Sequence, residues 1–253
     1  MLDISKKASI LAGDFLLDRF DKIHDYQKKG KPGDFSTEAD KEAEKIIIST
    51  LQEQFPKHNF ISEECGKINN DSEYTWIIDP LDGTFPYTAR LPFFGVSIGL
   101  VKNNIPILGV INLPKLKINL YAETGKGAFS NGEKIKVSSK KQLNESILSF
   151  DWGYLDEREV RIEKFLKPLS NKTRYLECFG CSIVAQAYVA LGIIDGYFHR
   201  AHPWDFAAGV CIIKEAGGKV TDWEGEKIDL FQERPTMIAS NGLIHSKILN
   251  LIK

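Results

Sequence analysis

Trp76-Ile77-Ile78-Asp79-Pro80-Leu81-Asp82-Gly83-Thr84 joins a short apolar run to two carboxylates, a glycine and a hydroxyl. Residues 75–78 are β-branched or aromatic, which is typical of a buried strand. Because proline cannot donate to a strand ladder, we expect the strand to end at Asp79. A turn at Pro80 and Leu81 then lets both aspartates reach one cation, with the Leu81 carbonyl beside them. Magnesium prefers oxygen ligands of this kind.

The same stretch ends in groups suited to an anion. Gly83 permits close approach of the backbone, and a helix beginning near Thr84 would point free N–H groups at a phosphate. The alternative is an ordinary Asp-Gly turn after a strand, which is common in proteins. Two aspartates with proline, glycine and threonine at this spacing are much less common. We therefore favour a site that holds hard cations against a phosphate.

Two further acidic segments lie upstream. Glu63 and Glu64 follow a predicted strand over 59–62, and Glu63 is a candidate to complete the cation site and to orient a water. A solvated pair at a strand end is the simpler explanation of these two residues taken alone. Thr37 and Asp40 fit a variant of the capping box at the start of a helix, and capping alone explains Asp40.

A fourth acidic segment covers residues 202–209. Pro203 marks a helix start, which places Asp205 in the first turn, where the helix dipole favours a negative charge. Trp204 beside it and the small residues after it favour a packed, positioned carboxylate over a solvated one. His202 is more simply explained as a packing residue than as a metal ligand.

Length and charge limit the classes of function. A chain of 253 residues is long enough for a large core, in one domain or two packed subdomains. The net charge of −1 gives no reason to propose a nucleic acid or a membrane surface as a partner. No apolar run approaches the ~20 residues of a membrane span, and the N-terminus lacks the apolar core of a signal peptide.

The cysteines and histidines do not form a familiar catalytic pattern. Cys178 and Cys181 make a C-x-x-C pair, but no second pair and no thioredoxin-like pattern accompanies it. We therefore favour packing and lining of a substrate pocket over redox chemistry for these thiols. No Ser/His/Asp or Cys/His constellation stands out, so a covalent enzyme intermediate is not expected. Free thiols suit a reducing compartment, and the cytoplasm is the expected location.

Hydrophobic periodicity predicts two regions of different character. In the first, helices from Ile4 to about Lys28 and from Thr37 to about Phe55 precede a run of antiparallel strands. In the second, strands alternate with helices, which suggests a layered α/β arrangement. The main strands of the first region are expected at 59–62, 75–79, 94–101, 107–111 and 118–122, with a hairpin turn at Asn103-Asn104. The helices of the second are expected at 157–169, 182–191, 204–215 and 243–252, and its strands at 147–150, 174–178, 195–198, 219–221 and 236–239.

These patterns divide the chain into two halves. We expect an N-terminal α+β subdomain over residues 1–135, with an antiparallel sheet, two long helices and most of the metal ligands. A C-terminal α/β subdomain over residues 136–253 would supply Asp205 and the substrate pocket. Because the carboxylates come from both halves, the active site should lie in the cleft between them.

Taken together, the motifs resemble those of the inositol monophosphatase family of magnesium-dependent, lithium-sensitive phosphatases. The resemblance rests on Glu63-Glu64, on Asp79 to Thr84, and on Trp204-Asp205 with Glu215 to Gly218 at the end of the same helix, all in the family's order and spacing. It extends over nearly the whole chain, and it implies a layered αβαβα fold and a homodimer. It also includes Lys29, Thr37, Asp40, Gly125 to Phe129, and Asn131-Gly132.

The resemblance implies a role for each motif residue. Glu63, Asp79 and the Leu81 carbonyl should hold a first Mg²⁺. Asp79, Asp82 and Asp205 should hold a second, and Glu63 also contributes to a weaker third position. A metal-bound water would then be activated by positioning and electrostatics, because the transition state spreads charge over the phosphoryl oxygens.

Other residues are implied to handle the water and the substrate. Thr84 and Asp40 resemble the pair that orients the nucleophilic water. The backbone N–H groups of Gly83 and Thr84 should receive the phosphate, near Asp82. Gly180 and Cys181 would line the substrate pocket, and Lys29 resembles the family's mobile basic residue near the metals.

The sequence departs from the family where the substrate should bind. Inositol-hydrolysing members usually carry a glutamate about seven positions before the Asp of the Trp-Asp motif, where it binds sugar hydroxyls. Phe198 stands at that count, but the loop looks one residue shorter, so His199 is the alternative occupant. Arg200 adjoins it and could bind an anionic group bidentately, although a surface or dimer contact explains it equally well. The segment Phe85-Pro86-Tyr87 also departs from the usual small polar pair.

Several substrates stay open at this point. Overall resemblance favours inositol monophosphate or a range of sugar phosphates. The loss of the glutamate favours a substrate with a second anionic group, such as fructose 1,6-bisphosphate or a 3′-phosphonucleotide. Histidinol phosphate is less favoured, because Arg200 would repel its amine. A catalytically silent protein that binds metal or phosphate as a regulator is the non-enzyme alternative.

Overall fold

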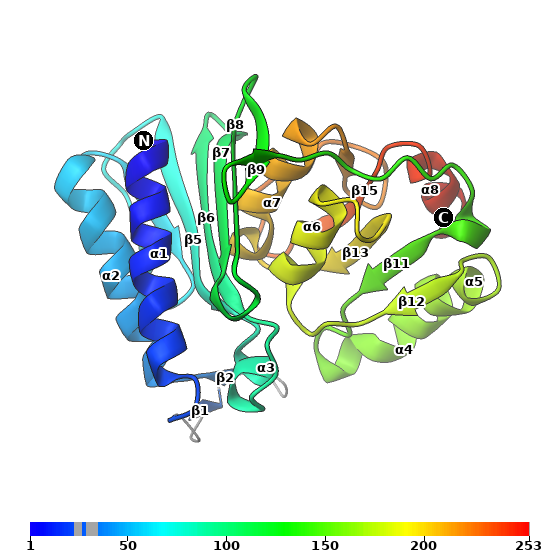
Figure 1. The fold of residues 1–253 in the computed structure, drawn as a ribbon, viewed down its shortest axis with the longest axis horizontal. Helices are drawn as coiled ribbons and strands as arrows, with labels where there is room; N and C mark the ends of the chain where they lie inside the picture. Colours follow the sequence, from blue (N-terminus) through cyan, green and yellow to red (C-terminus); the bar gives the residue numbers. More distant parts are fainter. Residues whose placement is uncertain (23–26, 29–34, 253) are drawn as a thin grey trace.

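The computed structural model describes residues 1–22, 27–28 and 35–252. Its helices and strands stack in five layers, helix, sheet, helix, sheet and helix (Figure 1). Helices α1 (Leu2–Arg19) and α2 (Glu38–Gln54) cover the outer face of an eight-stranded sheet. Helices α6 (Ser182–Ala190) and α7 (Pro203–Glu215) lie between this sheet and a five-stranded one. This arrangement confirms the predicted αβαβα layers.

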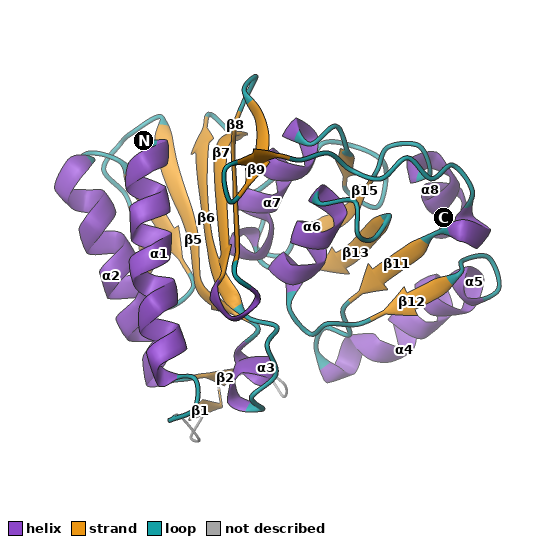
Figure 2. Ribbon diagram, in the orientation of Figure 1, coloured by secondary structure: helices purple, strands orange, loops and turns teal. Residues whose placement is uncertain are grey.

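The eight-stranded sheet, of which Figure 2 labels β5 to β9, is antiparallel except at one pair. Its order is β10-β9-β8-β7-β6-β5-β3-β4, and β3 runs parallel to β5. Asn103 and Asn104 form the tight turn between β6 and β7, each with a positive φ, of 49° and 60°. The strands are β3 (Asn59–Ser62), β4 (Gly66–Ile68), β5 (Tyr74–Asp82), β6 (Gly95–Lys102), β7 (Ile105–Leu113), β8 (Ile118–Glu123), β9 (Gly127–Ser130) and β10 (Glu133–Lys134).

Strand β5 differs from the prediction in an informative way. It does not end at Asp79 but continues to Asp82, with an irregularity in its pairing to β6. Asp79 pairs with Ser97 and Asp82 pairs with Gly95, so β5 carries one extra residue in this interval. Pro80 therefore lies in a β-bulge, one of the few places in a sheet where a missing N–H is tolerated. The bulge changes the side-chain alternation between the two aspartates.

The first helix is shorter than predicted. Helix α1 ends at Arg19, whereas the prediction extended it to about Lys28. Gln27–Lys28 instead form β1, which pairs antiparallel with β2 (Phe35–Ser36). The predicted mobile residue Lys29 lies outside the described residues.

The five-stranded sheet has the order β12-β11-β13-β15-β14. Strand β11 is parallel to both of its neighbours, and β15 is antiparallel to both of its own. The predicted helix over 157–169 is divided into α4 (Arg158–Arg161), a π-helical turn (Ile162–Leu166) and α5 (Lys167–Ser170). With α8 (His245–Ile252), these segments cover the outer face of the sheet (Figure 1). The strands are β11 (Ile147–Phe150), β12 (Tyr175–Glu177), β13 (Gly196–Arg200), β14 (Lys219–Thr221) and β15 (Thr236–Ser240).

The core between the two sheets depends on close packing of α7. A Cβ atom on Gly109 of β7 would lie 2.3 Å from the Ala208 backbone oxygen, and one on Gly99 of β6 would lie 2.7 Å from Ala207 Cβ. The small residues of the Trp-Asp segment therefore do allow a helix to approach a neighbouring element, as predicted. This contact places the start of α7, with Asp205, beside β5 and β6.

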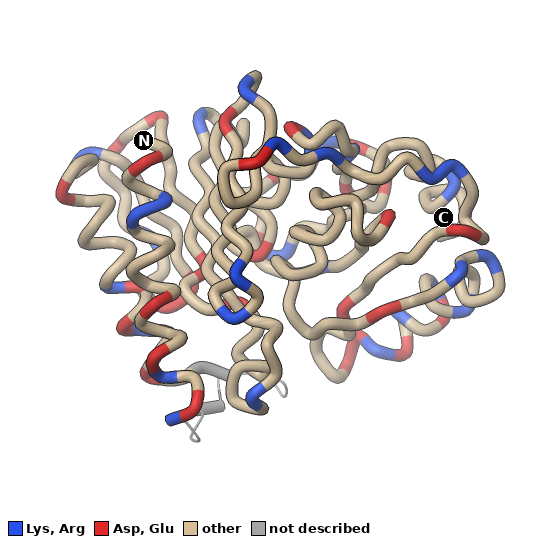
Figure 3. Tube along the Cα trace, viewed as in Figure 1, with Lys and Arg blue, Asp and Glu red and all other residues tan. Residues whose placement is uncertain are grey.

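Charged residues are distributed over the chain without a long run of one sign. Figure 3 shows basic and acidic residues interspersed along the helices and loops, in keeping with the net charge of −1. No helix in the part of the chain that the structure describes is both long and apolar enough to cross a membrane.

Candidate active site

A cleft of about 690 Å³ is lined by residues from 63–91 and from 151–234, on either side of the predicted division of the chain. Its walls come from the end of β5, the start of α3 (Thr84–Thr88), the segment after β11, the turn before α6 and the segment from β13 into α7. The volume is that of a small-molecule site. As predicted, the cleft is lined by residues of both halves.

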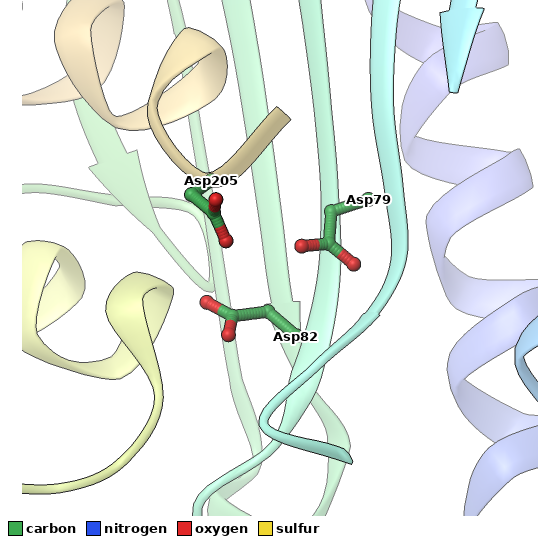
Figure 4. Close-up of side chains that lie close together, drawn as sticks. All are labelled: Asp79, Asp82 and Asp205. Carbon is green, nitrogen blue, oxygen red and sulfur yellow. The ribbon is translucent and has the colours of Figure 1, made fainter. Parts of the chain in front are cut away.

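Three aspartates meet in this cleft (Figure 4). Asp79 and Asp82 flank the bulge of β5, and Asp205 comes from the first turn of α7. One carboxylate oxygen from each aspartate can be chosen so that all three oxygens lie within 4.8 Å of one another. The structure therefore brings together three of the predicted metal ligands, from segments far apart in the sequence.

Backbone N–H groups hold each of the three carboxylates in place. Leu81 N donates to Asp79 Oδ1 at 3.0 Å, and His202 N donates to Asp205 Oδ2 at 2.7 Å. Asp82 Oδ2 accepts a 2.7 Å bond from Ile183 N at the start of α6. Each of these three bonds engages one carboxylate oxygen and fixes the direction of the carboxylate.

Burial and nearby negative charges disfavour the ionised form of all three carboxylates. Burial raises the pKa of Asp79 well above its ordinary value, and the charges of Glu63, Asp82 and Asp205 raise it further. Burial and the Asp82 charge do the same to the pKa of Asp205. Burial raises the pKa of Asp82 to about 7, although the Ile183 N–H favours its ionised form. A site that crowds anions in this way is suited to a cation.

The predicted residues Glu63 and Leu81 both line the cleft. The charge of Glu63 acts on Asp79 and Asp205, as their raised pKa values show. The Leu81 carbonyl oxygen accepts from the Thr84 hydroxyl at 3.2 Å, while its side chain is buried. Glu64 lies in the same turn, and its backbone N–H donates to Glu44.

Glu44 was not predicted from the sequence, yet it positions the turn that carries Glu63. Its side chain is buried on the inner face of α2, and Oε1 accepts from the Ser62 hydroxyl, Glu64 N and Cys65 N. A charged residue between Ala43 and Ile47, on the apolar face of the predicted helix, was the available signal.

We expect Glu44→Ala to lower the free energy of unfolding by about 2–4 kcal/mol, because three donors lose one charged acceptor. The same variant should bind Mg²⁺ more weakly, since the turn carrying Glu63 is released. Urea unfolding in EDTA and a metal titration followed by melting temperature measure the two effects. Glu42→Ala, on the exposed face of the same helix, is the control, and equal losses in both variants would contradict this role for Glu44.

Thr37 and Asp40, which are buried, form one network with the partly buried Thr84. Thr37 and Asp40 make the predicted capping box, in which Asp40 Oδ2 accepts from Thr37 N at 2.7 Å and from Thr37 Oγ1 at 2.6 Å. The other oxygen, Oδ1, lies 3.2 Å from Thr84 Oγ1. Asp40 therefore does more than cap helix α2, because its carboxylate also contacts the first residue of α3.

Gly83 is required by its conformation and by its surroundings. Its φ is 85°, in the left-handed region, and it forms the N-cap of α3. An added Cβ would lie 2.4 Å from the Phe93 oxygen. The helix predicted to begin near Thr84 is therefore present, and it starts directly after the bulge.

The C-x-x-C segment lies beside the same turn. Gly180 lines the cleft, and its N–H donates to Asp151 Oδ1 at 3.0 Å. Cys181 is buried behind Gly83, with Sγ 3.6 Å from the Asp82 carbonyl oxygen. Burial raises the pKa of Cys178 to about 12, so this thiol stays protonated near neutral pH. These positions agree with packing and pocket lining.

Asp151 is a second residue that the sequence argument missed. It is a buried carboxylate in the cleft wall, and it accepts from Tyr197 Oη at 2.7 Å as well as from Gly180 N. Burial raises its pKa to about 6. It follows the strand Ile147–Phe150, and an acidic residue at a strand end was the only signal available.

The structure shows which of the two alternative residues, Phe198 or His199, faces the cleft. Phe198 turns into the core of the outer layer, where its ring stacks on Phe165 at 5.0 Å. His199 points to the opposite face of β13 and lines the cleft, together with Arg200 at the end of that strand. Strand alternation therefore places His199, and not Phe198, on the cleft side of β13.

Comparison with known proteins agrees with this geometry. Residues 1–253 match the inositol monophosphatase family. The chain is 37% identical over 252 residues to a fructose-1,6-bisphosphatase/inositol-1-monophosphatase of Thermotoga maritima, covering 99% of this chain and 95% of that protein. It is 35% identical over 251 residues to an inositol-1-monophosphatase of Synechocystis sp., covering 98% and 86%.

Solved structures give the same result for the fold. The extragenic suppressor protein suhB from Bartonella henselae superposes with a TM-score of 0.93 at 34% identity, covering 99% of this chain and 97% of that one. An inositol monophosphatase of Thermotoga maritima superposes with a TM-score of 0.89 at 37% identity, covering 99% and 95%. With the carboxylates in the cleft and the match over the whole length, the chain belongs to the inositol monophosphatase family, a family of metal-dependent phosphatases, and is a phosphoric monoester hydrolase.

Proposed function

We propose that this phosphatase hydrolyses inositol monophosphate or a related small sugar phosphate, with two or three Mg²⁺ ions in the cleft. The observation that carries the proposal is the group of three aspartates whose oxygens lie within 4.8 Å of one another, with raised pKa values. The names of the Thermotoga and Synechocystis relatives, which refer to inositol monophosphate and fructose 1,6-bisphosphate, support the substrate class.

The donor set fits Mg²⁺. Every candidate ligand is an oxygen, as a hard cation requires, and ionised carboxylates this close repel one another without a cation. We assign Glu63, Asp79 and the Leu81 carbonyl to a first ion, and Asp79, Asp82 and Asp205 to a second. Glu63 also serves a third, weaker position. When bound, these ions neutralise charge on the phosphate and lower the pKa of a coordinated water.

Thr84 and Asp40 orient the attacking water. The Thr84 hydroxyl lies 3.2 Å from both Asp40 Oδ1 and the Leu81 oxygen, so its single proton is donated to one of these two acceptors. Its lone pairs then face outward as acceptors for a water hydrogen. Asp40 is itself held by Thr37, which fixes the direction of the Thr84 hydroxyl.

The phosphate would lie beside the start of α3, where the backbone N–H groups of Gly83 and Thr84 are its proposed donors. Gly180 forms the neighbouring wall of the cleft. Cys181 lies behind this wall and supports it through its contact with Asp82. Homodimer formation, a cytoplasmic location and sensitivity to lithium stay predictions of the family resemblance.

A phosphate-release assay across a panel of phosphomonoesters, with and without Mg²⁺, tests the proposal. Inositol 1-phosphate, fructose 1,6-bisphosphate, a 3′-phosphonucleotide and histidinol phosphate are the informative members. We expect turnover that depends on Mg²⁺ and is highest on a sugar or inositol phosphate. Turnover that persists in EDTA would overturn the metal assignment, and a preference for histidinol phosphate would overturn the substrate class.

The metal-free protein should lose stability as the pH rises. The folded state raises the pKa of Asp82 from an ordinary value of 3.8 to about 7, so the native protein binds this proton more tightly than the unfolded chain does. The free energy of unfolding therefore falls between about pH 4 and pH 7. We expect a decrease of about 2–4 kcal/mol in EDTA, measured by urea unfolding at several pH values. Asp82→Asn should flatten the profile, and an unchanged slope would contradict the electrostatic description of the cleft.

A further inference from the structure

We propose that a buried hydrogen-bond chain, which begins at Gln186 and ends at Asp151, positions Asp205 for its metal ion. This inference rests on the proposed metal site, and it adds to that site side chains that are not proposed as metal ligands. All members of the chain are buried. In order, they are Gln186, Ser182, Tyr197 and Asp151.

The contacts connect Asp205 to Asp151 without a break. Gln186 Nε2 donates to the Asp205 backbone oxygen at 2.7 Å and lies 2.8 Å from Ser182 Oγ. Ser182 Oγ lies 3.0 Å from Tyr197 Oη, which in turn lies 2.7 Å from Asp151 Oδ2. Ser182 Oγ is also 3.4 Å from the Asp205 oxygen, which is a longer contact than the one made by Gln186. The amide is therefore the member that acts on Asp205 most directly.

The charge of Asp151 fixes the direction of the chain. Burial raises the pKa of Asp151 to about 6, so above that pH its carboxylate is ionised and can only accept. Burial and this charge raise the pKa of Tyr197 well above its ordinary value, so its hydroxyl keeps its proton and donates it to Asp151. Tyr197 Oη then accepts from Ser182, and Ser182 Oγ accepts from Gln186. The amide thus has one orientation, with an N–H on the Asp205 oxygen.

The first turn of α6 holds two proposed metal ligands from separate segments. Ile183 N donates to Asp82 Oδ2 at 2.7 Å, and Gln186 in the same helix donates to the Asp205 oxygen. Helix α7 packs directly on this amide, because an added Cβ on Gly209 would overlap Gln186 Oε1. A shift of Gln186 would therefore move the start of α7, and Asp205 with it, relative to Asp82.

Stability alone does not account for a glutamine at this position. Gln186 is 0% exposed, and among the described residues no donor reaches its Oε1. A buried acceptor without a donor costs free energy, which an apolar side chain of similar size would avoid. The glutamine is therefore explained by what its N–H groups hold, namely the Asp205 oxygen and the Ser182 hydroxyl.

Calorimetric titration of the substrate-free protein with Mg²⁺ tests the inference. We expect Gln186→Met to raise the Mg²⁺ dissociation constant about 10-fold, the effect of losing one hydrogen bond that favours the position of a ligand. The melting temperature in EDTA should be unchanged or higher, because the unpaired Oε1 is removed. The kcat/KM should fall in proportion at subsaturating Mg²⁺ and much less at saturation.

A second variant tests whether the chain acts as one unit. Tyr197→Phe removes a hydroxyl that is hydrogen-bonded to Ser182 and Asp151. It should also raise the Mg²⁺ dissociation constant, by a smaller factor than Gln186→Met. The double variant should bind Mg²⁺ no more weakly than Gln186→Met alone, since residues of one network are not additive. Gln54→Met, at the exposed end of α2, is the matched control and should leave Mg²⁺ binding unchanged.

The outcomes separate this inference from the proposed function. If Asp205→Asn weakens Mg²⁺ binding but Gln186→Met does not, the chain has no part in positioning and the metal assignment stands. If the losses in Gln186→Met and Tyr197→Phe are additive, the two residues do not belong to one chain. If Gln186→Met does not fold, unchanged Mg²⁺ binding by Tyr197→Phe contradicts the inference. If the wild-type protein binds no Mg²⁺, the proposed metal site fails, and the inference fails with it.

Discussion

Asp205→Asn is expected to lower kcat/KM at saturating Mg²⁺ by about 10³-fold. The substitution removes the carboxylate charge that holds a proposed metal ion, and that ion supplies several kcal/mol of transition-state stabilisation. Asp82→Asn should have an effect of the same order. Asparagine keeps an oxygen that can accept the N–H of His202 or of Ile183, so the local fold should persist. Phosphate release and a Mg²⁺ titration of melting temperature measure the loss of activity and of metal binding.

The melting temperatures of these two variants distinguish a metal ligand from a residue that only supports the fold. Both aspartates have raised pKa values in the folded protein, so neutralising either should leave the metal-free melting temperature unchanged or higher. The stabilisation by added Mg²⁺ should be lost. Asp14→Asn, on the exposed side of α1, is the matched control for the loss of one carboxylate. Near-normal turnover in either cleft variant would show that the proposed ligand set is wrong.

Thr84→Val is the second variant with a large expected effect. It removes the hydroxyl that lies 3.2 Å from Asp40 Oδ1 while keeping the shape of the side chain. We expect kcat to fall by about 10²- to 10³-fold, the range for losing a group that positions a proton in the transition state. KM and the Mg²⁺ dependence should change much less, because the side chain is not one of the proposed metal ligands.

Thr84→Ser serves as the control, since it keeps the hydroxyl. It should retain most of the activity, and Asp40→Asn should resemble Thr84→Val in kcat. Single-turnover kinetics at saturating Mg²⁺ would separate a slower chemical step from slower product release. A Thr84→Val enzyme with wild-type kcat would remove Thr84 and Asp40 from the mechanism.

The segments that carry the candidate site could be predicted because neighbouring residues in each of them favour the same local structure. The apolar run before Asp79, the glycine at the start of α3 and the proline at the start of α7 each have a local physical meaning. The same is true of the asparagine pair between β6 and β7, where both residues adopt positive φ. In these places the presence of the element follows from neighbouring residues.

The predicted bounds were wrong for three elements, and for two of them a pairing between strands is the reason. Pro80 was expected to end β5, but pairing with β6 continues through a bulge to Asp82. The helix expected over 157–169 is instead interrupted by a π-helical turn at Ile162–Leu166. Helix α1 ends at Arg19, and Gln27–Lys28 pair as β1 with β2. Hydrophobic periodicity cannot reveal such a contact between segments.

Glu44 and Asp151 illustrate what sequence periodicity could not supply. Each is a buried carboxylate whose partners are backbone or hydroxyl donors on other segments, such as Glu64 N for Glu44 and Gly180 N for Asp151. Neither has a local motif, because an acid on a helix face or at a strand end is usually solvated. Only the folded arrangement shows that these two acids support the cleft.

The sequence by itself determined the kinds of side chain at the candidate site and their local positions, since carboxylates, glycine, threonine and the helix starts act over a few residues. Tertiary structure decided their convergence, because Asp205 reaches Asp79 and Asp82 only when α7 packs closely on glycines of β6 and β7. It also decided that His199, rather than Phe198, faces the cleft. Side chains of a strand alternate between two faces, and packing against the neighbouring layers decides which face lines the cleft.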